Sequence, residues 1–360
     1  MSRKITMSDK NRILWIDYVK AFAIITVVML HIPIGDPYRH IARSFVIPVF
    51  FFLSGIFSHP SRYATFGSFF RHKTIRLLLP YVIFNVLNYL YWLLIARHYG
   101  ADADMDMSVT KPLLGILSGI EPWMYHYKPL WFLPCLMVAE TLFWCTYRLS
   151  CSMDKAMVLP VCMVVLSGAG YALSALCVPP LPYGIGGAMS MCIFYYGGYL
   201  LAQNKNLMTA PFLQGNGQGW LLCLGMLMVA TPLCAWLSLQ TAETRVFENT
   251  YGNLLYAFPA TVLGGIALIA MAGLLCKLPA MRLLQYIGTH TLPILVFHLT
   301  IAGWVKGVTT FVLGLPLGIY DLLWVRLLLV AAVVLLSVPC CCIYDKIAAV
   351  VKSKALPVNS

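Results

Sequence analysis

Long apolar runs alternate with short polar segments along the whole chain. Ten runs are long enough to cross a bilayer, whose hydrocarbon core takes about 20 apolar residues per helix. We predict transmembrane helices over residues 13–34, 41–57, 75–97, 129–148, 156–177, 183–203, 219–239, 254–276, 283–304 and 321–345. The pattern therefore predicts an all-α polytopic membrane bundle over residues 13–345. A polar segment at 1–12 precedes it, and a polar tail at 346–360 follows it.

The composition agrees with this pattern. Hydrophobic residues make up 60% of the 360 residues, and charged residues make up 11%. Soluble proteins average roughly half apolar and a quarter charged residues, so a soluble domain and a disordered chain are excluded. An outer-membrane barrel is disfavoured because its alternating strands rarely produce long apolar runs. The first apolar run is also too long for a cleavable signal peptide.

The distribution of charge predicts the orientation in the membrane. The chain has 25 Lys and Arg against 13 Asp and Glu, a net charge of +12. The positive residues lie in short loops between apolar runs, which is typical of membrane topology and argues against nucleic-acid binding. With the N-terminus inside, sixteen Lys and Arg fall on the inner side and eight on the outer side. We therefore expect both termini in the cytoplasm and a bacterial cytoplasmic membrane as the location.

Three polar residues share one face of the first predicted helix. Lys20 and His31 are eleven residues apart, which at about 100° per residue places them on one face, about 16 Å apart along the axis. Asp17 lies within ion-pairing reach of Lys20. Such a polar stripe must face the bundle or a water-filled cavity. Two interpretations remain open. In the first, Asp17 and Lys20 reach the headgroups and His31 lies at the membrane interface. In the second, the imidazole of His31 acts as a general base on a hydroxyl.

Two further groups of charged residues need an explanation. The basic segment with Arg71, Lys73 and Arg76 either anchors the topology, binds anionic lipid, or binds phosphate groups at the cytoplasmic mouth. Glu140 lies in the middle of the fourth predicted helix, where a carboxylate must be neutral, paired or catalytic. Lys20 and Arg326 are conceivable partners for Glu140.

The remaining polar candidates have structural interpretations beside functional ones. Ser54 precedes Gly55 in the second helix, a pair that predicts close helix packing, whereas a nucleophilic serine would need a base beside it. His290 and His298 fit hydrogen-bonded structural roles, and the spacing of their neighbours predicts no metal site. The outer segment 98–128 ends in aromatic residues, which indicates either a carbohydrate-stacking face or an interfacial aromatic belt.

The ordered set of motifs resembles the acyltransferase-3 family of integral membrane acyltransferases. Within that family it is most similar to stand-alone sugar O-acetylases of the fucose 4-O-acetylase type, which lack an esterase-like domain. The resemblance covers residues 12–304. It rests on Lys20 followed by ten residues and then His31, on the Ile47–Gly55 run, on Lys73-x-x-Arg76 before Pro80-Tyr81, and on Trp131-Phe-Leu with Gly288–Pro293 and a closing His298.

The resemblance implies transfer of an acyl group, usually acetyl, from cytoplasmic acyl-CoA to a hydroxyl of a cell-envelope glycan or lipid-linked sugar. The essential histidine of the family falls on His31, and its basic partner falls on Lys20, where many members have Arg. The implied partners are acyl-CoA, a carbohydrate acceptor and membrane lipids. Taken together with the residue patterns above, the candidate residues are His31, Lys20 and Asp17 for catalysis, Arg71, Lys73 and Arg76 for CoA phosphates, and Ser54, Trp131, Glu140, His290 and His298 as substrate-binding or structural candidates.

Two alternatives belong to other functional classes. A transporter or exporter of a lipid-linked sugar accounts equally well for ten helices, intramembrane charge and an aromatic outer segment. It leaves the ordered motifs unexplained. A structural subunit of a glycan assembly complex predicts no stable CoA binding. Binding and cleavage of acyl-CoA therefore discriminate among the three.

Overall fold

The chain folds into an all-helical bundle in a computed structural model that describes residues 13–32, 34–99, 107–176, 179–210, 213, 219–279 and 281–355, with side chains to residue 346. In these ranges one isolated bridge, Arg245 to Thr250, is the only strand-like pairing. The predicted segment 1–12 and most side chains of the predicted tail lie outside the described residues.

Ten helices of the described chain are long and apolar enough to cross a membrane, which confirms the predicted fold class. They are α1 (Leu14–His31), α2 (Tyr38–Ile56), the third span Phe66–Tyr99, α7 (Phe132–Met153), α8 (Val158–Ala175), α9 (Ile185–Gln203), α11 (Gly219–Leu239), α12 (Leu254–Leu275), α14 (Thr291–Gly307) and α15 (Leu323–Ala355). Connecting segments contain the shorter helices α6 (Lys111–Ser118) and α10 (Lys205–Met208).

The third span begins well before the predicted residue 75. It consists of α3 (Phe66–Lys73), a π-helical turn, α4 (Leu79–Tyr91), a second π-helical turn and α5 (Arg97–Tyr99). Thr65 and Ser68 form a reciprocal capping box at its start, which satisfies backbone groups that would otherwise lack partners. The basic segment that we expected to be a loop is therefore helical.

The ninth predicted helix is divided at His290. A short helix, α13 (Arg282–Thr289), ends there, and α14 starts at the next residue. Gly288 in α13 packs directly on the backbone of Asp17 in α1, and a Cβ at this glycine would overlap the Asp17 carbonyl. The break allows α13 to dock on α1 while α14 crosses the bundle in its own direction.

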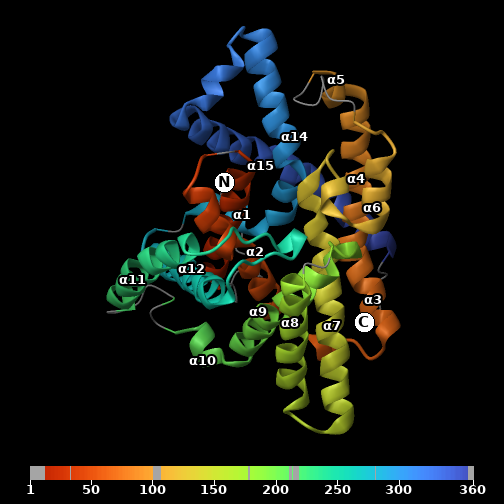
Figure 1. Ribbon diagram of the computed structural model, residues 1–360, viewed down its shortest axis with the longest axis vertical. Helices are drawn as coiled ribbons and strands as arrows, with labels where there is room; N and C mark the ends of the chain where they lie inside the picture. The colour runs from red at the N-terminus through yellow and green to blue at the C-terminus, as the bar shows by residue number, and fades with distance from the viewer. Residues whose placement is uncertain are drawn as a thin grey trace, which may run out of the picture.

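The first two helices occupy the middle of the molecule (Figure 1). Helix α1 contacts α2, α12, α13, α14 and α15, and α7, α8 and α9 lie side by side at one end. Helices α2 and α9 approach closely because Gly55 meets the backbone of Tyr195 and Gly198 meets the backbone of Phe52. The close packing that the Ser54-Gly55 pair predicts is confirmed.

Candidate active site

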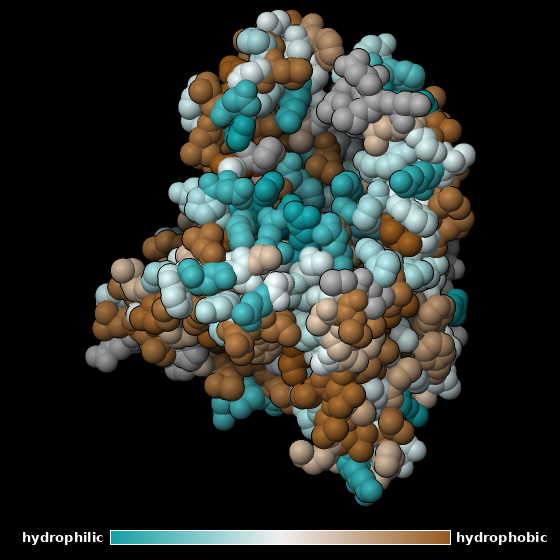
Figure 2. All heavy atoms as spheres, viewed as in Figure 1, coloured by the Kyte–Doolittle hydropathy of each residue, from teal (hydrophilic) through white to brown (hydrophobic). Residues whose placement is uncertain are grey.

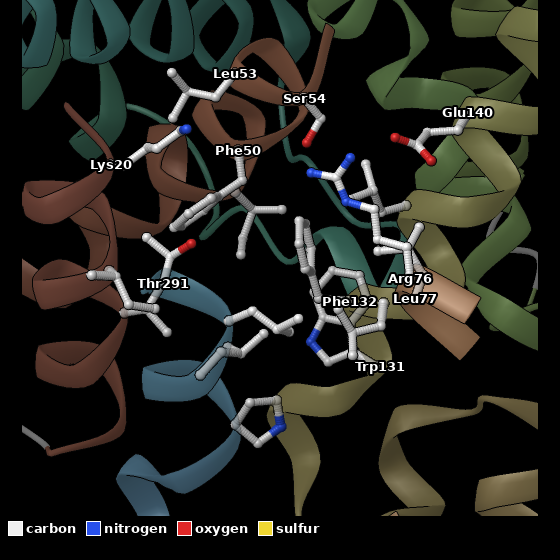
Figure 3. Close-up of a pocket in the computed structure, with 18 of the residues that line it drawn as sticks. Lys20, Phe50, Leu53, Ser54, Arg76, Leu77, Trp131, Phe132, Glu140 and Thr291 are labelled. Atoms are coloured by element: carbon white, nitrogen blue, oxygen red, sulfur yellow. The ribbon is translucent and has the colours of Figure 1, made fainter. Parts of the chain in front are cut away.

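A cavity of about 220 Å³ lies between α1, α2, the third span, α7 and α14. Lys20 and His31 both line it, so the shared helix face brings them into one space. Lys73, Arg76 and Glu140 also line the cavity, which gives its wall three cationic side chains and one acidic one. Figure 3 shows Lys20 and Arg76 pointing toward this space from opposite sides.

His31 ends α1 with its imidazole open to the cavity. Its Nδ1 lies 2.8 Å from the carbonyl oxygen of Val27. Because that carbonyl can only accept, Nδ1 carries the proton of the neutral ring, and Nε2 carries the lone pair. The backbone hydrogen bond therefore sets the tautomer and leaves Nε2 able to take a proton from a ligand in the cavity.

A second imidazole packs against that of His31. The ring of His298 in α14 lies 5.0 Å from that of His31, edge to face. His298 is fully buried, and its Nδ1 lies 2.9 Å from the Leu295 carbonyl oxygen, which also accepts a 2.9 Å hydrogen bond from the Tyr127 hydroxyl. Sequence analysis named His298 a candidate but gave no sign of its contact with His31.

At the other end of the cavity, a buried ion pair joins the third span to α7. Lys73 Nζ lies 2.9 Å from Glu140 Oε2, and only 10% and 8% of the two side chains is exposed. Glu140 is thus paired with Lys73, not with Lys20 or Arg326, the two partners that the sequence suggested. Lys20 Nζ instead lies 3.9 Å from the centroid of the Phe57 ring, and Arg326 pairs with Asp321.

A smaller cavity of about 50 Å³ adjoins the first behind this ion pair. Both cavities share Phe57, Lys73, Arg76 and Glu140 as wall residues. The smaller one adds Arg62 and further polar and aromatic side chains, among them His59, His72, Tyr63 and Trp144. Sequence analysis counted Arg62 only as an inner charge. The sequence did show that Arg62 follows the second predicted span on its inner side, and this position could have suggested a role at the cytoplasmic mouth.

At the His31 end of the protein, charged residues form a network around Glu243. The Glu243 carboxylate lies 2.7 Å from Arg43 Nη1, 3.0 Å from Arg245 Nε and 3.6 Å from Arg39 Nε. Burial alone would raise the pKa of this carboxyl, but the three arginines hold it below its usual value. Figure 2 shows hydrophilic side chains gathered across this face, over the loop between α11 and α12.

The comparison with protein families shows to which family the chain belongs. The family model of the acyltransferase-3 domain, described as an acyltransferase domain, matches residues 13–345. The chain belongs to the acyltransferase-3 family. The match covers all ten candidate spans except the last residue of the tenth. A search of curated proteins and a search of solved structures each returned no match.

Several predicted site residues line this first cavity, and others lie outside it. Ser54 and Trp131 line it. Asp17 is buried where α13 docks on α1, and exposed Arg71 lines neither cavity described above.

His290 also lies outside the first cavity. It stacks on Tyr286 with ring centroids 4.0 Å apart, and its Nε2 lies 2.9 Å from Asp345 Oδ2. These contacts tie the junction of α13 and α14 to α15. In the part of the chain that the structure describes, no group of three or more His, Cys, Asp or Glu side chains could hold a metal ion.

The aromatic segment before α7 folds down onto the bundle. Tyr127 and His126 are buried, and Tyr125 packs against Trp92 with ring centroids 5.3 Å apart. His126 and Tyr127 therefore pack inside the protein and are not part of an open stacking face. Tyr127 instead connects this segment to His298, whose ring contacts that of His31.

His126 predicts a pH-dependent stability. Its Nε2 donates to Asn85 Oδ1 over 3.0 Å, and burial lowers the pKa of His126 to about 4 from about 6.5 in an unfolded chain. Between these values the unfolded chain binds more protons, so we expect this group to remove about 3 kcal/mol of stability as pH falls from about 6.5 to 4. Unfolding at pH 7 and 4.5 measures this loss. His126→Gln, which keeps a donor for Asn85, should lose less, and equal losses in both proteins would contradict the assignment.

Proposed function

We propose that the protein is a membrane O-acyltransferase that moves an acyl group, acetyl in the first instance, from cytoplasmic acyl-CoA to a hydroxyl of a cell-envelope glycan or lipid-linked sugar. The observation that carries the proposal is one cavity with cationic side chains at the Lys20 and Arg76 end and an accessible imidazole, His31, at the other. A bacterial cytoplasmic membrane with both termini inside fits this proposal, since anionic acyl-CoA would meet the cationic end.

The donor would bind through the two adjoining cavities. Arg62 and Arg76 are exposed arginines on their walls, and guanidinium groups bind phosphate in a bidentate manner. Lys73 contributes less net charge than its sequence position suggested, because Glu140 pairs with it. We therefore assign the CoA phosphates to Arg62 and Arg76. The acyl-bearing thioester would pass Lys20 toward His31.

The reaction that we propose depends on the tautomer of His31, whose Nε2 carries the lone pair. His31 Nε2 takes the proton of the acceptor hydroxyl as the oxygen attacks the thioester carbonyl. The carbon–sulfur bond breaks, and the proton held by His31 passes to the departing CoA thiolate. His298 supports the ring of His31 from the side. A second route with the same balance places the acyl group on Nε2 first and transfers it to the acceptor in a second step.

Calorimetric titration of the purified protein with acetyl-CoA tests the donor site. Loss of a hydrogen bond to a charged group costs about 1.5–3 kcal/mol, so we expect Arg62→Ala/Arg76→Ala to weaken binding by at least tenfold. Arg71→Ala is the matched control, because Arg71 lines neither cavity, and it should bind like the wild type. His31→Gln should also bind normally.

The same titration separates the proposal from its rivals. An exporter of a lipid-linked sugar and a structural subunit both predict no acetyl-CoA binding by any of these proteins. That result would lead us to reject acyl-CoA as the donor. Equal weakening by Arg71→Ala would show that net surface charge, and not the two cavities, attracts the donor.

A further inference from the structure

A second large cavity lies on the opposite side of α2 from the catalytic one. It has a volume of about 300 Å³ and is bounded by α1, α2, α9 and α12. Helix α2 separates the two spaces: Phe50 and Ser54 line the catalytic cavity, whereas Val49 and Phe52 line the second. Nothing in the proposed acyl transfer uses this second space.

No side chain that lines the second cavity has a hydrogen-bond donor left for a ligand. Thr261 is its one lining residue with a polar side chain. The Thr261 hydroxyl already lies 2.7 Å from the carbonyl oxygen of Ser44 and 2.9 Å from that of Ala257. Water in a buried cavity needs two to four polar partners, so water does not fill this space. The lining suits a hydrocarbon ligand.

The depth and opening of the cavity indicate which hydrocarbon fills it. On α12 (Leu254–Leu275) its lining runs from Phe258 to Ile269, so the two ends of the lining lie about 6 Å and about 9 Å from the nearer end of that helix. Phe258 and Val262 also line the cavity, and each is 39% exposed at the surface of the protein. The cavity therefore continues the surface that α12 presents to lipid at the middle of the bilayer, where alkyl chains are the surrounding medium.

We propose that this cavity binds one alkyl chain of a bilayer lipid. The chain enters between α9 and α12 and packs against the face of α2 that points away from the catalytic cavity. It supplies the dispersion contacts that the lining residues otherwise lack. The lipid thereby supports the helix whose other face carries Phe50 and Ser54 into the active site.

Photolabelling in nanodiscs tests the lipid site, with phosphatidylcholine that carries a diazirine in the middle of one acyl chain. Mass spectrometry then compares the label on Ile193 and Phe194, which line the cavity, with the label on Leu255, an 81% exposed surface residue that serves as the internal reference. We expect both places to be labelled in the wild type. A diazirine close to the headgroup should label Ile193 and Phe194 several times less.

Gly265→Leu places a bulky side chain in the cavity and leaves less room for an alkyl chain. A Cβ at Gly265 would lie 3.6 Å from Val49 Cγ2, an ordinary contact, so the leucine should be accommodated. We expect label on Ile193 and Phe194 to fall at least fivefold while label on Leu255 is unchanged. Gly225→Leu in α11 is the matched control, because a Cβ there meets nothing within 4 Å, and it should be labelled like the wild type.

Two results would overturn the proposal: a wild type without label on Ile193 and Phe194, or equal label in the wild type and Gly265→Leu. If Gly265→Leu fails to fold, Gly197→Leu gives the same reading from α9, since a Cβ there lies 3.8 Å from the Phe52 ring. Neither reading depends on acyl transfer, so the lipid site and the proposed enzymatic function fail independently.

Discussion

Replacing His31 with glutamine is expected to lower the rate of acyl transfer by about 10²–10⁴-fold, the usual contribution of a positioned general base. Glutamine keeps an N–H that can donate to the Val27 carbonyl, so the end of α1 should keep its local structure. Its side chain has no basic nitrogen to take the acceptor proton or to carry an acyl group. Release of free CoA thiol from acetyl-CoA, in membranes that contain the native acceptor, measures the effect.

A control and a trapping experiment sharpen this prediction. His98→Gln makes the same change at an exposed position outside the catalytic cavity and should leave the rate unchanged. Labelled acetyl-CoA without an acceptor distinguishes the two chemical routes, because only an acyl-histidine route leaves label on the protein. A His31→Gln protein that folds normally and retains the full rate would exclude both routes.

Breaking the ion pair between Lys73 and Glu140 should produce the largest loss of stability. Lys73→Met leaves the Glu140 carboxylate with 8% exposure and no cationic partner at hydrogen-bond distance. Removal of one partner from a buried pair costs about 3–5 kcal/mol. Unfolding of the purified protein by titration with sodium dodecyl sulfate measures this loss.

A double variant tests whether the loss of stability comes from the unpaired charge on Glu140. Lys73→Met/Glu140→Leu replaces both charges with apolar groups, and such replacements are often neutral or stabilising, so most of the lost stability should return. Lys155→Met, at an exposed position, should unfold like the wild type. A Lys73→Met protein as stable as the wild type would show that Glu140 is protonated or otherwise satisfied in the native protein.

Features that depend on one helix could be predicted from the sequence. Ten apolar runs correspond to ten candidate spans because a helix alone must satisfy its backbone groups in lipid. The cavity shared by Lys20 and His31 likewise follows from the helical repeat. The boundary near residue 75 was wrong because a capped, basic helical turn carries no hydropathy signal.

Features that depend on packing between distant segments could not be predicted. Lys73 and Glu140 belong to different spans, and no local rule pairs them. The contact between His31 and His298 arises only when α14 packs beside α1. The break at His290 is visible once α13 is seen docked on the backbone of Asp17. Hydropathy treats that segment as one continuous apolar run.

The central claim is that the acyl donor enters from the cytoplasm and reacts at His31. Everted and right-side-out membrane vesicles that contain the protein can each be supplied with [¹⁴C]acetyl-CoA, which does not cross the bilayer. We predict label in membrane glycan or lipid-linked sugar with everted vesicles alone, and none when those vesicles carry His31→Gln. Equal labelling from right-side-out vesicles, or transfer that survives the loss of His31, would contradict the account.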